Sequence, residues 1–350
     1  MSTQETIRLY DNDAYATEFE AAVLSCEPKA DTDNLYEVVL DQTLFFPEEG
    51  GQSPDKGVIN GINVVDVQIK NGVIIHTVDI AVTENEAGSE PDKTKHDKTN
   101  IDKTKLDKIS AGSHISGKID WQHRFYNMQQ HSGEHIFSGI VHSRFGFENV
   151  GFHLSDSVVT MDFSGVISPE NIADIEREVN VAITKNIPVE VTYPSKTELE
   201  SLEYRSKIEI EGQVRIVTVP GYDVCACCAP HVKRTGEIGM LKVMNYQNYK
   251  GGVRISILCG FRALEAFRQK SQIISELMGI FTTNQEAIID NVTKLKALNQ
   301  SLKSELGSAK AEILDYKIAS LPTDIDNAIL FEADLDSNAA RSCVNKLVEK

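Results

Sequence analysis

Two histidines, His131 and His135, are the first residues whose type and spacing suggest chemistry. They form an HxxxH pattern in a segment with helical periodicity, and residues four apart lie on one face of a helix. Both imidazoles can therefore reach one ion, although two surface histidines would show the same spacing. The zinc-peptidase pattern places a glutamate directly after the first histidine. Here Glu134 directly precedes the second one, which disfavours that class of enzyme.

A second pair with the same spacing occurs at Cys227 and His231. Together the two pairs supply three imidazoles and one thiolate, a donor set that Zn2+ prefers. We therefore predict one Zn2+ bound by His131, His135, Cys227 and His231. A purely structural zinc is the alternative, because four protein ligands are typical of structural sites and a catalytic site keeps an open position.

The cysteine distribution favours metal or thiol chemistry over disulfides. Six cysteines are present, and three of them, Cys225, Cys227 and Cys228, lie within four positions. The others are far apart in the chain, unlike the framework of a small secreted protein. A thiol-redox or metal-sensing role is thus a further alternative.

Composition limits the classes of function. The 350 residues carry 35 basic and 52 acidic side chains, a net charge of −17, whereas a protein that binds nucleic acid through its overall field is expected to be basic. A polyanionic partner must therefore be bound by a local patch. No apolar run is long enough for a membrane helix, and the N-terminus lacks the regions of a signal peptide. We expect a cytoplasmic protein without a membrane partner.

The helices and strands that must position these residues follow one another in an order that predicts an α+β protein. Residues 1–118 are expected to form a small antiparallel β-barrel, with strands at 36–40 and 64–69 and a hairpin at Asn71-Gly72. Within this segment, residues 84–108 repeat Asp-Lys-Thr every five residues, which predicts a disordered charged insertion.

The rest of the chain predicts three further parts. Residues 119–261 combine helices at 121–147 and 169–185 with strands, and are expected to form the zinc-binding domain. Residues 262–317 are polar and helical, and a Thr283-x-x-Glu286 capping box predicts where a second helix begins. About three heptads follow, which predict a coiled coil, either as a hairpin within the chain or as a homodimer seam. Residues 318–350 are expected to begin a C-terminal α/β domain, with a strand at 328–331.

A glycine-rich segment covers residues 40–57. Its Gly50-Gly51 pair predicts a turn with positive φ, and it also lets the backbone approach a ligand closely. The segment lacks the spacing of a phosphate-binding loop.

The order of these motifs resembles a known family. LDxTxFxPxxGGQxxDxG at residues 40–57 is followed by Asp120-Trp121, by the HxxxH pair and by CxxxHVxxTGEIG at 227–239. This order closely resembles the alanyl-tRNA editing proteins (the AlaX group, long form) and the editing domain of alanyl-tRNA synthetase, over roughly residues 15–260. Two departures are the sequence Cys-Cys-Ala-Pro-His where the family usually has CGGTH, and Phe-Phe-Pro where it has FYP. The first makes Cys225 and Cys228 candidate substitute or auxiliary thiols.

The resemblance implies a free-standing hydrolase that deacylates tRNA for alanine mischarged with serine or glycine, with Zn2+ as cofactor. It assigns the zinc ligands to the two pairs above and the sensing of the amino acid to Thr43, with Gly50, Gly51 and Gln52 shaping the pocket wall. The alternative is a non-catalytic tRNA-binding module with a structural zinc. Glu134 is either a general base or a solvated carboxylate. The sequence does not rank serine against glycine.

A tRNA partner also needs a basic surface. Residues 225–256 hold five basic side chains against Glu237 alone, a local balance of +4. Tyr246 and Tyr249 interleave them and can stack on unpaired bases. The predicted tRNA-binding residues are Lys233, Arg234, Lys242, Lys250 and Arg254; the alternative is that these are ordinary surface residues and core tyrosines.

Overall fold

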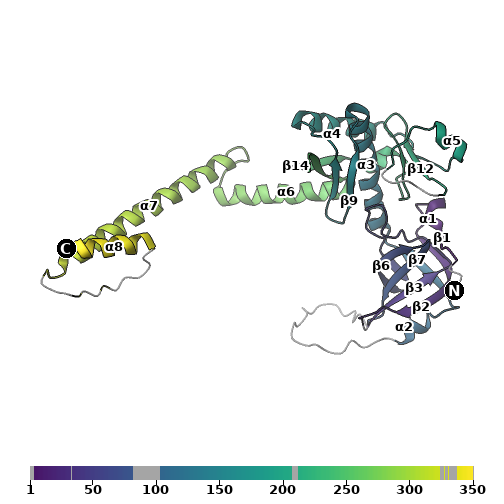
Figure 1. Cartoon of the computed structure of the whole chain (residues 1–350), viewed down its shortest axis with the longest axis horizontal. Coiled ribbons are helices and arrows are strands. Elements are labelled where there is room, and N and C mark those ends of the chain that lie inside the picture. The colour runs from purple at the N-terminus through teal and green to yellow at the C-terminus, as the bar shows by residue number, and fades with distance from the viewer. Residues whose placement is uncertain are drawn as a thin grey trace. The chain divides into compact units, whose positions relative to one another are not determined.

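The computed structural model shows a mixed α+β protein, as predicted (Figure 1). It divides into two compact units, Met1–Phe267 and Arg268–Lys350, and the finer division into four parts stays a prediction. In the described part of the chain, no helix is long and apolar enough to cross a membrane. The structure describes residues 4–32, 34–81, 103–206, 212–323, 327, 330 and 337–349.

The N-terminal β part consists of six antiparallel strands in the order β2-β3-β7-β6-β5-β8, and β8 pairs back with β2 to close the ring. Alternating apolar residues such as Val38 and Leu40 are fully buried inside it. Asn71 and Gly72 join two strands with φ values of 52° and 78°, which confirms the predicted hairpin. The strands are β2 (Glu18–Pro28), β3 (Leu35–Leu40), β5 (Gly57–Ile59), β6 (Ile62–Lys70), β7 (Val73–Asp79) and β8 (His114–Ile119).

Short elements flank this ring. Strand β1 (Ile7–Arg8) pairs with β4 (Gln42–Thr43), and α1 (Leu9–Asn12) follows β1. Helix α2 (Lys103–Asp107) lies in the segment predicted to be disordered, and Leu106 packs against the core of the ring. The prediction of disorder is therefore wrong for these residues, whereas residues 84–102 lie outside the described part.

The second core lies between a four-stranded antiparallel sheet and two helices. Helix α3 begins after Asp120, whose carboxylate accepts from the His123 backbone N–H, and ends at Gly146 in the left-handed conformation. The apolar faces of the helices, including Ile136 and Ile175, are buried with the sheet. The predicted helices are thereby confirmed. The elements are α3 (Trp121–Phe145), α4 (Pro169–Thr184), and the sheet β14 (Leu241–Tyr249), β15 (Gly252–Cys259), β10 (Val159–Phe163) and β9 (Asn149–Leu154).

A smaller sheet completes this part. Strands β11 (Glu190–Thr192), β12 (Ile216–Val219) and β13 (Asp223–Ala226) pair in that order, and α3 contacts β13. Helix α5 (Lys196–Ser201) and the 3-10 helix η1 (Thr235–Ile238) lie in the connections.

A buried ion pair fixes the glycine-rich segment to α3. The Arg124 side chain is fully buried, and its Nε lies 3.0 and 2.9 Å from the two carboxylate oxygens of Asp55. Asp55 also accepts from the Phe46 backbone N–H at 2.7 Å. Removing one partner of such a pair typically costs about 3–5 kcal/mol, because the other charge stays buried. The segment is thus held in register with the histidine helix.

Three helices follow: α6 (Gly260–Phe281), α7 (Ile288–Ser320) and α8 (Ser337–Glu349). Leu314 of α7 packs with Cys343 of α8. Helix α7 begins at Ile288 with no side-chain cap, so the capping-box prediction at Thr283 is wrong; the Ala287 N–H binds the Asn284 side chain instead. The apolar heptad positions of α7, such as Leu302 and Leu306, are exposed. Their role in a coiled coil stays a prediction. The strand predicted at 328–331 lies outside the described residues apart from Leu330.

Candidate metal centre

The structure brings the four predicted ligands together. Ligand atoms of His131, His135, Cys227 and His231 all lie within 4.8 Å of one another. Cys227 Sγ is 3.6 Å from His131 Nε2 and 3.4 Å from His231 Nε2. A tetrahedral zinc with Zn–S of about 2.3 Å and Zn–N of about 2.0–2.1 Å separates sulfur from nitrogen by about 3.6 Å. The donor set and its spacing therefore fit Zn2+.

Local structure explains this convergence. His131 and His135 lie on consecutive turns of α3, and their side chains are almost completely buried. Cys227 directly follows β13, and His231 precedes η1. Arg215 holds the loop between them, because its Nη1 donates to the Cys227 carbonyl at 2.7 Å and to that of Ala229 at 3.0 Å.

Each imidazole of the three potential ligands is anchored through its Nδ1, which leaves Nε2 available to a metal ion. Such outer hydrogen bonds fix the ring orientation and the tautomer of a metal-binding histidine. The pairs are His131 Nδ1 with Gln52 Oε1 at 2.7 Å, His135 Nδ1 with Asp223 Oδ2 at 2.9 Å, and His231 Nδ1 with Ser132 Oγ at 3.0 Å.

The electrostatic environment favours the thiolate form of one cysteine, Cys227. Burial opposes ionisation of the Cys227 thiol, but the imidazoles of His131 and His231 outweigh burial and hold its pKa well below the usual range. Burial raises the pKa of both Cys225 and Cys228. Because the thiolate is the metal ligand, the structure favours Cys227 among the three clustered thiols.

The Asp223 carboxylate faces His135 Nδ1 and stabilises a positive charge on that imidazole. Burial by itself lowers the pKa of His135, but the hydrogen bonds and charges of Asp223 and Cys227 together outweigh burial and raise the pKa to about 9. The same carboxylate binds Arg205 through two bonds, of 2.7 Å to Nε and 2.9 Å to Nη2. Cys225 lies beside this pair and forms a second group of potential ligands with His135 and Asp223.

The glycine-rich turn packs directly against the centre. Gly50 and Gly51 have φ values of 62° and 85°, and a Cβ on Gly51 would lie 2.4 Å from the Phe152 carbonyl oxygen. Only glycine fits this position without displacement. The Phe152 ring lies 4.8 Å from that of His131. Gln52, predicted as part of a pocket wall, thus anchors His131 from this turn.

Thr43 belongs to a buried polar chain. Its hydroxyl accepts from the Phe45 N–H at 3.0 Å and lies 2.9 Å from His76 Nε2. His76 Nδ1 faces the Val38 carbonyl oxygen at 3.1 Å, so this nitrogen carries the hydrogen and the Thr43 hydroxyl donates to Nε2. Burial lowers the pKa of His76 to about 4, which keeps the ring neutral. The predicted role of Thr43 in specificity stays a prediction.

Glu134 is buried rather than solvated, so that alternative is wrong. The residue is 1% exposed, and its Oε1 accepts from Ser138 Oγ and from Asn149 Nδ2, both at 2.7 Å.

Two of the predicted tRNA-binding residues bind carboxylates at hydrogen-bond distance. Lys242 Nζ lies 2.7 Å from Glu176 Oε1. Arg254 binds Asp162 through two hydrogen bonds of 2.6 and 2.7 Å. Their charges are therefore largely compensated within the protein.

The other three lie at the surface. Lys233 and Arg234 follow His231 closely in sequence, and both are exposed. Lys233 Nζ lies 4.2 Å from the centre of the Tyr15 ring and 3.9 Å from Asp13 Oδ1. Lys250 Nζ lies 5.1 Å from the centre of the Tyr249 ring. Lys233 and Arg234 are thus the predicted basic residues nearest in sequence to the metal centre.

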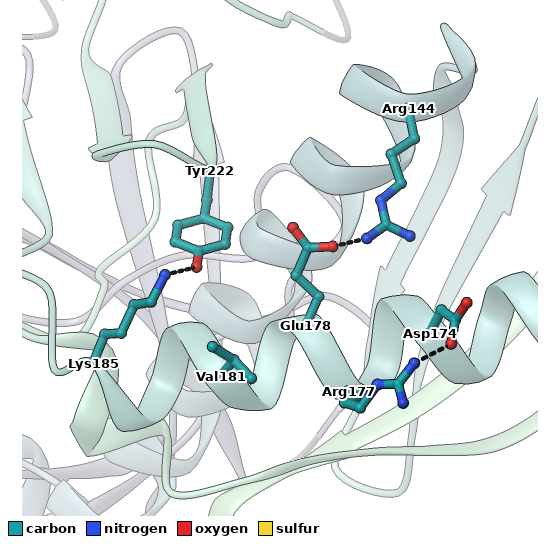
Figure 2. A pocket seen from close by; sticks show the side chains of 7 residues that line it. All are labelled: Arg144, Asp174, Arg177, Glu178, Val181, Lys185 and Tyr222. Carbon is teal, nitrogen blue, oxygen red and sulfur yellow. Dashed lines mark hydrogen bonds and ion pairs between the residues drawn. The ribbon is translucent and has the colours of Figure 1, made fainter.

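Two cavities lie outside the ligand cluster. Figure 2 shows one of about 340 Å³, in which Arg144 pairs with Glu178 and Arg177 with Asp174. Lys185, the third basic residue, donates to the Tyr222 hydroxyl at 2.9 Å instead. The second, of about 630 Å³, is lined partly by Arg205 and Asp223 and so adjoins the support of His135. The residues lining the first are Arg144, Asp174, Arg177, Glu178, Val181, Lys185 and Tyr222.

Comparison with protein families places two regions of the chain among tRNA synthetase domains. Residues 214–256 match the threonyl and alanyl tRNA synthetase second additional domain. Residues 3–99 match the class II (A) tRNA synthetases. The first match covers the cysteine-histidine half of the centre, and the second covers the glycine-rich turn.

Similar proteins narrow this class. The chain is 29% identical to alanyl-tRNA editing protein AlaX-L of Pyrococcus horikoshii, over 89% of the chain and 72% of that protein. It is 28% identical to alanyl-tRNA editing protein Aarsd1 of Bos taurus, over 83% and 63%. With alanine–tRNA ligase of Methanobrevibacter smithii it shares 29% identity, over 92% of the chain but 34% of the ligase. The resemblance to alanyl-tRNA editing proteins that the motifs predict is confirmed.

Proposed function

We propose that this protein is a zinc-dependent hydrolase that removes serine or glycine from mischarged tRNA for alanine. The observation that carries the proposal is the cluster of three imidazoles and one thiolate whose distances match a tetrahedral zinc. The names of AlaX-L and Aarsd1 supply the substrate class.

The roles of the chain's residues follow from their contacts. His131, His135, Cys227 and His231 would hold the ion, which when bound supplies Lewis-acid polarisation of the ester carbonyl or of a water. Gln52 fixes His131, and the glycine-rich turn that carries it forms one side of the centre. Lys233 and Arg234, next to the His231 loop, would contact the tRNA backbone.

A non-catalytic module with a structural zinc is the second candidate, because the cluster already supplies four protein ligands. In that case the protein would bind tRNA without turnover. Hydrolysis requires a loosened ligand or a fifth position on the ion.

A deacylation assay with Ser-tRNA and Gly-tRNA tests the proposal. Wild type should hydrolyse at least one of the two, and His131→Ala should lose that activity. His142→Ala is the matched control, because His142 lies on the same helix with its side chain 44% exposed. Inactivity of the zinc-loaded wild type, or equal activity of His131→Ala and His142→Ala, would contradict the proposal.

A further inference from the structure

Three donor side chains converge on one carboxylate at the surface near the glycine-rich turn. Asp156 Oδ2 lies 2.6 Å from Lys56 Nζ, and Asp156 Oδ1 lies 2.9 Å from His123 Nε2. Arg262 Nη2 is 3.5 Å from the same Oδ1. These four residues, the Asp156 cluster, come from four different segments of the chain.

The cluster has an accessible rim and a buried floor. The side chains of Lys56 and Asp156 are 51% and 54% exposed, whereas those of His123 and Arg262 are only 9% and 10% exposed. Asp156 lies in a bend between β9 and β10. Its carboxylate can therefore leave the other three groups without disturbing a core.

Two buried polar atoms, one of His123 and one of Asn127 beside Arg262, have no hydrogen-bond partner among the described residues. Asn127 is fully buried and its Oδ1 accepts from Arg262 Nη2 at 2.8 Å, but its Nδ2 has no hydrogen-bond partner among the described residues. The same holds for His123 Nδ1. An unsatisfied buried polar group is destabilising unless an occupant binds it.

The field at the cluster favours an anion. His123 and Arg262 lie in the first turns of the long helices α3 and α6, where the helix dipole adds positive potential. Asp120, which caps α3, is a nearby carboxylate. A backbone phosphodiester carries one negative charge, as the Asp156 carboxylate does, and its two non-bridging oxygens would take the places of Oδ1 and Oδ2. Asn127 Nδ2 is a further donor, without a partner among the described residues, beside Arg262.

The position relative to the metal centre identifies the anion's source. His123, Asn127, His131 and His135 follow one another at intervals of four residues along α3, so consecutive members are neighbours. From His123 to His131 the helix rises about 12 Å. A few nucleotides of an extended strand can bridge that distance. Backbone bonds between Leu154 and the glycine-rich segment also join the two sites.

We propose that Lys56, His123, Asn127 and Arg262 form a binding site for a backbone phosphate of the tRNA acceptor end, from which Asp156 is displaced. The inference rests on the proposed function for the identity of the nucleic acid. It assigns the site a positioning role: it holds the strand whose terminal ester reaches the metal centre.

The test measures the affinity of the zinc-loaded protein for deacylated tRNA for alanine at several salt concentrations. Lys56→Gln should bind about tenfold more weakly, and its dependence of log K on log salt should be shallower by about 0.7–0.9. Asp156→Asn should bind about threefold more tightly, because a competing carboxylate is lost. Lys118→Gln is the matched control, since Lys118 of β8 forms an exposed ion pair with Glu18 at 2.7 Å.

A phosphate site predicts that the two substitutions change tRNA affinity in opposite directions, whereas a purely structural ion pair does not. Equal affinities of Lys56→Gln and Lys118→Gln, or weaker binding by Asp156→Asn, would overturn the inference, as would absence of tRNA binding by wild type. Because the probe carries no ester, the expected pattern in a protein that hydrolyses neither Ser-tRNA nor Gly-tRNA would support this site while refuting the proposed function.

Discussion

Asp223→Asn tests whether the outer hydrogen bonds tune the metal centre. The substitution keeps the shape of the side chain but removes the charge that faces His135 Nδ1 at 2.9 Å. A neutral amide orients the imidazole less firmly and makes it a weaker donor to the ion. Loss of such an outer partner typically lowers metal affinity 10- to 100-fold, which corresponds to about 1.4–2.8 kcal/mol.

The structure also ranks the three anchors. Asp223 is charged and buried, so its replacement should reduce zinc affinity most. Gln52→Leu removes a neutral bond of 2.7 Å to His131 and should have a smaller effect. Ser132→Ala removes a neutral bond of 3.0 Å to His231 and should have the smallest.

Zinc affinity is measured by competition with a chromophoric chelator at fixed pH, and thermal unfolding of the zinc-loaded proteins checks that each variant folds. Asp162→Asn is the matched control, because Asp162 also binds an arginine, Arg254, through two hydrogen bonds. Asp223→Asn leaves Arg205 short of a charge partner and will lower stability as well. If Asp223→Asn and Asp162→Asn bind zinc equally well, the reasoning about the outer hydrogen bonds is refuted.

Four further predictions follow from the same structure. Cys227→Ala should lose zinc by metal analysis; full retention would contradict the ligand assignment. Thr43→Val should lower deacylation of Ser-tRNA relative to Ala-tRNA by about 1–3 kcal/mol in transition-state free energy, and an unchanged ratio would place the discriminator elsewhere. If the heptads join two copies, Leu302→Lys with Leu306→Lys should halve the mass in solution of a dimeric parent, and an unchanged mass would refute the seam. Because burial lowers the pKa of His76 from its ordinary 6.5 to about 4, the unfolded chain binds this proton first as pH falls. Stability should therefore decrease by about 2 kcal/mol between about pH 7.5 and about pH 5, and urea unfolding of His76→Gln should show a correspondingly smaller decrease.

The sequence predicts the main helices and the two pairs of potential ligands that the structure brings together, because both depend on local spacing. The period of α3 places His131 and His135 on one face whatever surrounds the helix, and the Asn71-Gly72 turn has few alternatives. Burial of Glu134 was not predictable in this way. Its position on α3 alone fits solvent as well as core, and only the packing of Asn149 and Ser138 decides between them.

The supporting residues of the centre depend on tertiary contacts, which a single sequence does not reveal. Asp223 lies 88 residues from His135, and no motif connects the two. Ser132 follows a ligand directly, which was a usable signal, but its partner His231 is 99 residues away. The glycine-rich motif suggests Gln52 as a wall residue, whereas the structure shows its Oε1 against His131 Nδ1. Motif spacing thus predicts which atoms can bind the ion, whereas the groups that orient those atoms emerge only when the glycine-rich turn, α3 and β13 are brought together.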